Sequence, residues 1–159
     1  MQGSPGRSTV ILLVEDDPTE VRLLQEAFKG VLVPIHLHVV HEGREALAFL
    51  RHEAPYQHAP RPALILLSLK LPGMSGEQLL AVLKCDPALH TIPAIVFTNS
   101  LSPQSIQQSY ELGANSYIIK PFGFTQLVEV MHAIVVYWLQ VVTQAPSSTP
   151  RRGFVARIS

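Results

Sequence analysis

Cysteine and charged residues are both scarce in this sequence. The one cysteine, Cys85, excludes an internal disulfide, and a lone thiol with no second ligand nearby indicates a reducing compartment. The twelve Lys and Arg residues are balanced by twelve Asp and Glu residues. Without a net positive charge, the chain lacks the field that attracts nucleic acid or an anionic membrane. We therefore expect a cytoplasmic protein that binds neither.

Long apolar runs are also missing. The first nine residues contain no apolar stretch typical of a signal peptide, and no segment supplies the roughly 20 apolar residues that cross a bilayer. Hydrophobic residues still make up 47% of the 159 residues, which predicts one globular domain with a full apolar core. We expect a chain that is neither exported nor membrane-spanning.

Short apolar runs alternate along the chain with longer segments of helical periodicity. This alternation is typical of an α/β fold in which helices cover both faces of a parallel sheet. The third run is aliphatic without interruption, so we place it at the centre of the sheet. The predicted strands are residues 10–14, 35–40, 63–67, 94–98 and 116–119, and the predicted helices are residues 18–29, 43–50, 77–84, 103–112 and about 123–142.

The start of the first helix carries three local signals. Asp17 can cap the helix, Pro18 suits its first position, and Glu20 completes a capping box. Gly30 follows the last residue of the same segment and ends the helix.

The domain limits follow from composition. Residues 9–142 form the predicted domain, and a proline-rich link over residues 55–62 separates its two halves. Residues 1–8 are a predicted tail, and residues 143–159, which contain Pro, Ser and Arg without periodicity, are a predicted disordered tail.

Polar side chains lie at the ends of four predicted strands. In open parallel sheets, ligands bind beyond the carboxyl ends of the strands. The first strand is followed by Glu15 and Asp16, the third by Ser68 and the fifth by Lys120, and the fourth ends at Thr98. Carboxylates suit Mg²⁺, while a hydroxyl and an ammonium hold phosphoryl oxygens. The sequence therefore predicts a site for a hard cation and a phosphoryl group.

These residues resemble the receiver domain of bacterial two-component response regulators over roughly residues 8 to 142. The resemblance rests on Glu15-Asp16, on Leu-Pro-Gly-Met-Ser-Gly at positions 71–76, on Thr98 and on Lys120-Pro121. Within the family, the chain is most similar to the single-domain regulators that pair with bacterial phytochrome histidine kinases. The closer likeness is carried by the proline-rich segment 54–62 and by Tyr137-Trp138-Leu139 in the last helix.

The resemblance implies a flavodoxin-like fold with strand order 2-1-3-4-5 and an extended last helix. It implies a signalling protein rather than an enzyme, with a sensor histidine kinase, of the phytochrome class, as partner. It also implies roles for individual residues: Glu15, Asp16 and the backbone carbonyl of Lys70 would hold Mg²⁺, Thr98 and Lys120 would bind phosphoryl oxygens, and Thr98 with Tyr117 would form the conformational switch.

One residue departs from the family pattern. Where the family carries its phosphorylated aspartate, this chain has Ser68. A serine hydroxyl is a weak nucleophile until a base activates it. Serine also carries no charge, so the cation would meet two carboxylates instead of three. We expect a receiver that does not accept phosphoryl groups, that binds Mg²⁺ weakly or not at all, and in which Lys120 pairs with Glu15 or Asp16. Either a natural pseudo-receiver or an altered active receiver would have this sequence.

The last predicted helix is apolar on nearly all sides. A helix that covers one side of a sheet needs a single apolar stripe, so a second stripe predicts contact with another chain. We expect a homodimer through this helix, with Val135, Tyr137, Trp138 and Val142 in the interface.

Two other functions share this architecture. A flavin-binding flavodoxin-like protein would need a phosphate-binding loop after the first strand, where Glu15-Asp16-Asp17 would repel phosphate. A phosphohydrolase of the haloacid-dehalogenase type could use Lys120, but Glu15 replaces its nucleophilic aspartate. A flavin absorbance spectrum and a phosphatase assay discriminate between these alternatives.

Overall fold

The computed structural model describes residues 9–146. The predicted tail at 1–8 and all but the first four residues of the predicted tail at 143–159 lie outside the described residues. Residues 143–146 contain neither helix nor strand. The elements in chain order are β1 (Thr9–Val14), α1 (Pro18–Lys29), β2 (Ile35–Val40), α2 (Gly43–Leu50), β3 (Leu64–Leu67), α3 (Gly76–Cys85), β4 (Ala94–Thr98), α4 (Pro103–Glu111), β5 (Ser116–Ile119), α5 (Phe124–Val135) and the π-helical η1 (Val136–Val141). The predicted strands and helices are therefore present, with ends that differ by a few residues.

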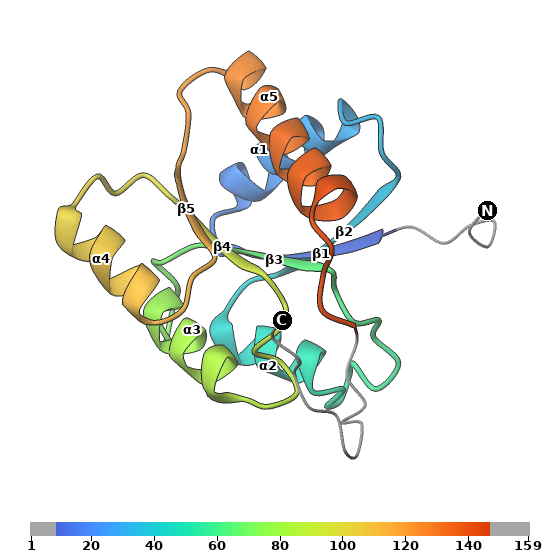
Figure 1. The fold of residues 1–159 in the computed structure, drawn as a ribbon, viewed down its shortest axis with the longest axis vertical. Coiled ribbons are helices and arrows are strands. Elements are labelled where there is room, and N and C mark those ends of the chain that lie inside the picture. The colour runs from blue at the N-terminus through green and yellow to red at the C-terminus, as the bar shows by residue number, and fades with distance from the viewer. Residues whose placement is uncertain (1–8, 147–159) are drawn as a thin grey trace, which may run out of the picture.

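The five strands form one parallel sheet in the order β2-β1-β3-β4-β5. Both the predicted order and the central place of the aliphatic β3 are confirmed. Helices α1 and α5 cover one face of the sheet, and α2, α3 and α4 cover the other (Figure 1). The result is a three-layer α/β fold.

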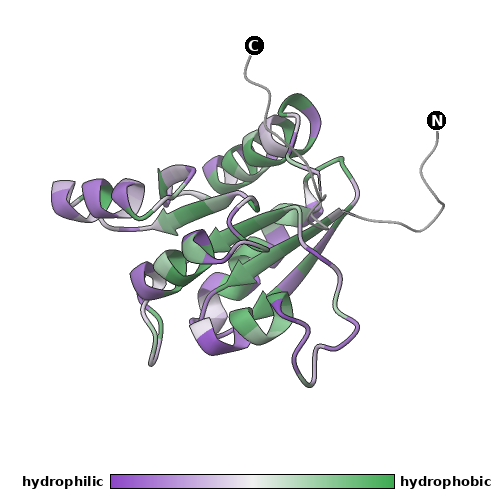
Figure 2. Ribbon diagram, turned by 60° about the horizontal axis from the view of Figure 1, so that its bottom comes forward, coloured by the Kyte–Doolittle hydropathy of each residue, from purple (hydrophilic) through white to green (hydrophobic). Residues whose placement is uncertain are grey.

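Alternate strand residues face opposite sides of the sheet and build two apolar cores. Leu12 and Val14 of β1 pack with α2 and α3, whereas Ile11 and Leu13 pack with α1 and α5. The inner strands are accordingly apolar on both faces (Figure 2). Val14 pairs with Leu67 across β1 and β3, so the residues that follow these strands leave the sheet at the same edge.

The start of α1 corrects one sequence prediction. Asp17 caps the helix by accepting a hydrogen bond from the backbone N–H of Thr19 at 2.8 Å, and Pro18 occupies the first turn as expected. The predicted capping box with Glu20 is wrong, because the Glu20 carboxylate pairs with Lys120 instead. A tertiary ion pair thus replaces the local contact.

The last helix does not continue to Val142 as a regular α-helix. It changes at Val136 to a π-helical turn, and the backbone N–H of Val142 donates to the carbonyl of Tyr137 at 2.8 Å. Together α5 and η1 span Phe124–Val141, 18 residues with a mean hydropathy of 1.3. By length and composition alone this helix could cross a membrane, contrary to the expectation that no segment would, but its buried residues pack against the sheet and α1.

The packing of this helix also corrects the predicted dimer surface. Val135 is fully buried in the core of its own chain and is not available to a partner. Trp138 is half-buried against the same core, and its ring meets that of Tyr137 edge to face with 5.3 Å between centroids. Tyr137 is 54% exposed and Val141 is 64% exposed. Tyr137 and Val141, rather than Val135, are therefore the exposed apolar side chains at the end of the helix.

Polar contacts join helix α4 to the edge strand β5. Its only buried residue is Ser109, whose hydroxyl finds no hydrogen-bond partner within the described residues. The outward backbone N–H of Tyr117 on β5 donates to the hydroxyl of Tyr110 on α4 at 3.0 Å. The Tyr110 side chain therefore satisfies one backbone hydrogen-bond donor at the edge of the sheet.

Candidate functional site

An open cleft of about 980 Å³ lies at the carboxyl ends of β1, β3, β4 and β5. The short loops after these strands place the predicted site residues around one space, because the strands are parallel and end in register. The lining includes Glu15, Asp16, Ser68, Lys70, Thr98 and Lys120. All the residues predicted for the cation and phosphoryl site are therefore together.

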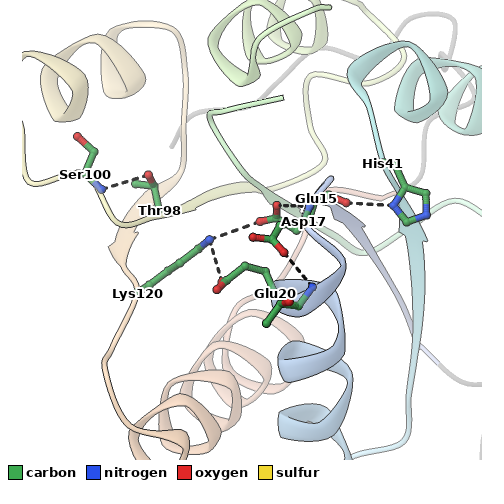
Figure 3. A network of polar contacts seen from close by, with 8 residues as sticks. Glu15, Asp17, Glu20, His41, Thr98, Ser100 and Lys120 are labelled. Carbon is green, nitrogen blue, oxygen red and sulfur yellow. Dashed lines mark hydrogen bonds and ion pairs between the residues drawn. The ribbon is translucent and has the colours of Figure 1, made fainter. Parts of the chain in front are cut away.

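Glu15 is the buried acid of the cleft. Its residue is 4% exposed, and one carboxylate oxygen, Oε2, accepts a hydrogen bond from the backbone N–H of Asp17 at 3.0 Å. The other oxygen, Oε1, lies 3.4 Å from Nζ of Lys120 (Figure 3). The predicted pairing of Lys120 with one of the first two acids is confirmed for Glu15. The neighbouring Asp16 is exposed.

Lys120 has a second carboxylate partner that the sequence did not reveal. Its Nζ lies 3.0 Å from Oε1 of Glu20, which reaches the cleft from the first turn of α1 (Figure 3). The same ammonium lies 5.8 Å from the centre of the Phe97 ring, a cation–π distance. Two carboxylates and an aromatic face therefore hold this ammonium in the cleft.

Ser68 occupies the floor of the cleft directly after β3. Its backbone N–H donates to the carbonyl of Val14 at 3.1 Å, which continues the ladder between β3 and β1. Ser68 is 9% exposed. A Cβ at Gly76 would overlap the carbonyl oxygen of Ser68, so the loop between them closes only with glycine there. The backbone of Gly76 therefore lies directly against that of Ser68.

Thr98 and Tyr117 lie on either side of the loop after β4. Thr98 is buried, and its hydroxyl oxygen accepts a hydrogen bond from the backbone N–H of Ser100 at 3.2 Å. The hydroxyl of Tyr117 donates to the carbonyl of Ser100 at 2.9 Å and lies 3.2 Å from Oγ of Ser105. Both side chains thus bind the same loop, which leads into α4.

His41 is a further residue of the cleft region that sequence reasoning missed. Its Nδ1 lies 3.2 Å from the backbone oxygen of Glu15, and Figure 3 shows it on the opposite side of Glu15 from Lys120. No local pattern distinguishes this histidine, because its contact is with a residue 26 positions away.

The donor atoms of the cleft suit a hard divalent cation in type but are few in number. Glu15 and Asp16 offer carboxylate oxygens and Lys70 a backbone carbonyl, the ligands that Mg²⁺ accepts together with water. Both oxygens of Glu15 are already engaged with Lys120 and Asp17. Among residues 9–146, no three His, Cys, Asp or Glu side chains are grouped as a metal site. Water would have to complete the coordination.

The sequence matches the response regulator receiver domain over residues 11–132. The chain belongs to this family of signalling domains. The response regulator Rcp1 of Synechocystis sp. is 40% identical over 134 residues, which cover 84% of this chain and 91% of the relative. The probable methanogenesis regulatory protein FilR2 of Methanothrix harundinacea is 35% identical over 131 residues, 82% of this chain and 83% of that protein.

Solved structures of receivers agree with the fold. The phosphorylated cyanobacterial phytochrome response regulator RcpA superimposes with a TM-score of 0.82 at 40% identity, covering 88% of this chain and 100% of that chain. The Mn²⁺-bound form of Rcp1 superimposes with a TM-score of 0.79 at 38% identity, covering 87% and 99%. The chain is therefore a receiver related to phytochrome response regulators, and the family assignment favours this function over the flavodoxin-like and phosphohydrolase alternatives.

Proposed function

We propose that this protein is a cytoplasmic, single-domain member of a two-component phosphorelay that signals through protein contacts and does not itself accept phosphoryl groups. The observation that carries the proposal is Ser68, which stands after β3 on the floor of the acidic cleft. The partner would be a sensor histidine kinase of the phytochrome class, because the related solved receivers are phytochrome response regulators. Whether Ser68 is natural or introduced does not alter this chemistry.

Ser68 is a poor nucleophile for phosphoryl transfer. A carboxylate is ionised at neutral pH and can attack the phosphorus of a phosphohistidine, whereas a serine hydroxyl must first lose its proton to a base. Glu15 is the buried carboxylate of the cleft, and its two oxygens are engaged with Lys120 and with the backbone N–H of Asp17. The buried carboxylate of the cleft is therefore not free to activate Ser68.

The affinity of the cleft for a cation should also be low, because Ser68 supplies no carboxylate and Glu15 is already paired with Lys120. Glu15, Asp16 and the carbonyl of Lys70 would hold Mg²⁺, which would neutralise charge in the cleft when bound. The ion pair between Lys120 and Glu15 competes with the cation for the Glu15 carboxylate. We expect Mg²⁺ affinity well below that of a receiver with three carboxylates.

The proposal also gives roles to Thr98, Lys120 and Tyr117. Thr98 and Lys120 would bind phosphoryl oxygens in an active receiver, and Tyr117 would report the state of the cleft. In this chain the hydroxyl of Tyr117 is held by Ser100 and Ser105. We propose that these bonds keep α4 in one arrangement.

A homodimer through the last helix is part of the proposal. The exposed side chains of Tyr137 and Val141 lie on the outer surface of η1, and Trp138 and Val142 are half-buried beside them. Burial of this apolar surface against a second copy would satisfy a two-fold interface. Such a dimer would not depend on phosphorylation.

Phosphorylation by acetyl phosphate tests the central claim. Incubation with acetyl phosphate and Mg²⁺ should leave the mass of the chain unchanged. The Ser68→Asp variant should gain one phosphoryl group that hydroxylamine removes, because an acyl phosphate is labile to that nucleophile. Stoichiometric labelling of the unmodified chain would contradict the proposal, and Ser102→Asp, on the loop before α4, is the matched control that should stay unlabelled.

A further inference from the structure

A line of hydrogen bonds leads from the proline-rich link to the end of β1. The hydroxyl of Tyr56, in the link, donates to Oε2 of Glu45 on α2 at 2.5 Å. The other carboxylate oxygen of Glu45 accepts from the backbone N–H of His41 at 2.8 Å. The ring of His41 then reaches the backbone oxygen of Glu15. Because a carbonyl oxygen only accepts, Nδ1 of His41 carries the proton in this contact.

The link end of this line is well anchored. The Tyr56 ring is half-buried and packs edge-on against Phe49 at 5.4 Å and against His38 at 5.9 Å between ring centroids. The hydrogen bond to Glu45 raises the pKa of Tyr56 to about 12, so the hydroxyl keeps its proton at neutral pH. The link is thereby attached to α2 through one tyrosine.

The cleft end of the line holds the backbone of Glu15. The N–H of Glu15 donates to the carbonyl of Val40 at 3.0 Å, and its carbonyl faces the ring of His41. The last residue of β2 and the residue that follows it therefore contact both backbone groups of the buried acid. The direction of the Glu15 carboxylate, which faces Lys120, depends on this backbone.

We infer that Tyr56, Glu45 and His41 are positioning residues through which the proline-rich link sets the geometry of Glu15 and the affinity of the cleft for a divalent cation. The inference rests on the cation site of the proposed function. Groups that orient metal ligands without touching the metal change metal affinity when they are removed. A protein partner that binds the link and displaces Tyr56 would therefore weaken cation binding. Because coupling between two sites is reciprocal, the bound cation would weaken the binding of that partner by the same factor.

Calorimetric titration of the full chain with Mn²⁺ tests the inference. We expect affinity to fall about tenfold in His41→Ala and about threefold in Tyr56→Phe. Because Tyr56 acts through His41, adding Tyr56→Phe to His41→Ala should cause no further loss. The matched controls are Tyr137→Phe and His90→Ala, whose side chains are exposed and lie on other elements. Equal affinities of Tyr56→Phe and Tyr137→Phe, or additive losses in the double variant, would overturn the inference.

A conservative variant separates positioning from folding. Glu45→Gln keeps an acceptor for the N–H of His41 and should keep most of the Mn²⁺ affinity, whereas Glu45→Ala should lose as much as His41→Ala. If Glu45→Gln and Glu45→Ala lose affinity equally, the inference fails.

Amide NMR of the metal-free chain distinguishes this inference from the proposed cation site. Tyr56→Phe should move the amide resonances of Asp16 and Asp17, and Tyr137→Phe should not. If these resonances move but Mn²⁺ binds nowhere in the cleft, the line of positioning residues is supported and the cation site fails. If they stay in place, the inference is wrong whatever the metal does.

Discussion

The ammonium of Lys120 lies closer to Glu20, at 3.0 Å, than to Glu15, at 3.4 Å, although Glu15 is the more deeply buried of the two carboxylates. The side chain of Glu15 is 5% exposed and that of Glu20 is 29% exposed. Water can therefore solvate Glu20 but hardly reaches Glu15. The ion pair to Glu15 matters more for stability, because its loss leaves a charge without compensation.

Replacement of Lys120 should destabilise the fold more than replacement of Glu20. We expect Lys120→Met to lower the free energy of unfolding by about 3 kcal/mol, because the buried Glu15 carboxylate loses its cation. Glu20→Gln should cost about 1 kcal/mol, as for a partly exposed pair. Urea denaturation measures both, with the exposed Lys70→Met as control. Equal costs for Lys120→Met and Glu20→Gln would show that burial of Glu15 does not decide the energetics.

The loop that carries Ser68 predicts a second difference, between two glycines. Gly76→Ala should lower the free energy of unfolding by about 3 kcal/mol, because its Cβ would overlap the carbonyl of Ser68 and the backbone of Leu69. Gly73→Ala should cost about 1 kcal/mol, because its φ of +72° disfavours a side chain but the space around it is open. Thermal and urea unfolding provide the measurement. A milder effect at position 76 than at position 73 would contradict the close approach.

The half-buried His38 predicts a dependence of stability on pH. Burial, and then the neighbouring His36, lower the pKa of His38 below its ordinary value of 6.5. The unfolded chain therefore binds a proton at higher pH than the folded chain does, and stability falls as the pH drops through 6.5 toward the folded pKa. His38→Gln should reduce the loss of stability between pH 7 and pH 5.5, and the exposed His90→Gln should not. An unchanged pH profile in His38→Gln would refute this assignment.

The exposed end of the last helix predicts self-association. Size exclusion with light scattering should give a dimer, and Tyr137→Glu should weaken it by a factor of ten or more, since about 2 kcal/mol is typical of an aromatic anchor. Leu32→Glu is the control, because Leu32 is 91% exposed on the loop between α1 and β2. A monomer at about 50 μM, far above the dissociation constants of stable dimers, would remove the proposed interface.

Much of the fold could be predicted because its signals are local. An uninterrupted apolar run such as residues 94–97 is typical of a strand in a sheet that is covered on both faces. The role of Glu20 could not be predicted, because an acid at this position suits both a capping box and a tertiary ion pair. The burial of Val135 was missed for a related reason. A helix that is apolar on nearly all sides does not reveal which stripe meets the sheet.

Tyr110 has a consequence for solubility. Strand β5 is an edge of the sheet, and a free edge can pair with the edge of another molecule and begin aggregation. The hydroxyl of Tyr110 already occupies the outward N–H of Tyr117 in the middle of this short strand. An incoming strand would have to break that hydrogen bond and move α4 before it could pair. The contact between α4 and β5 therefore opposes edge-to-edge pairing at β5.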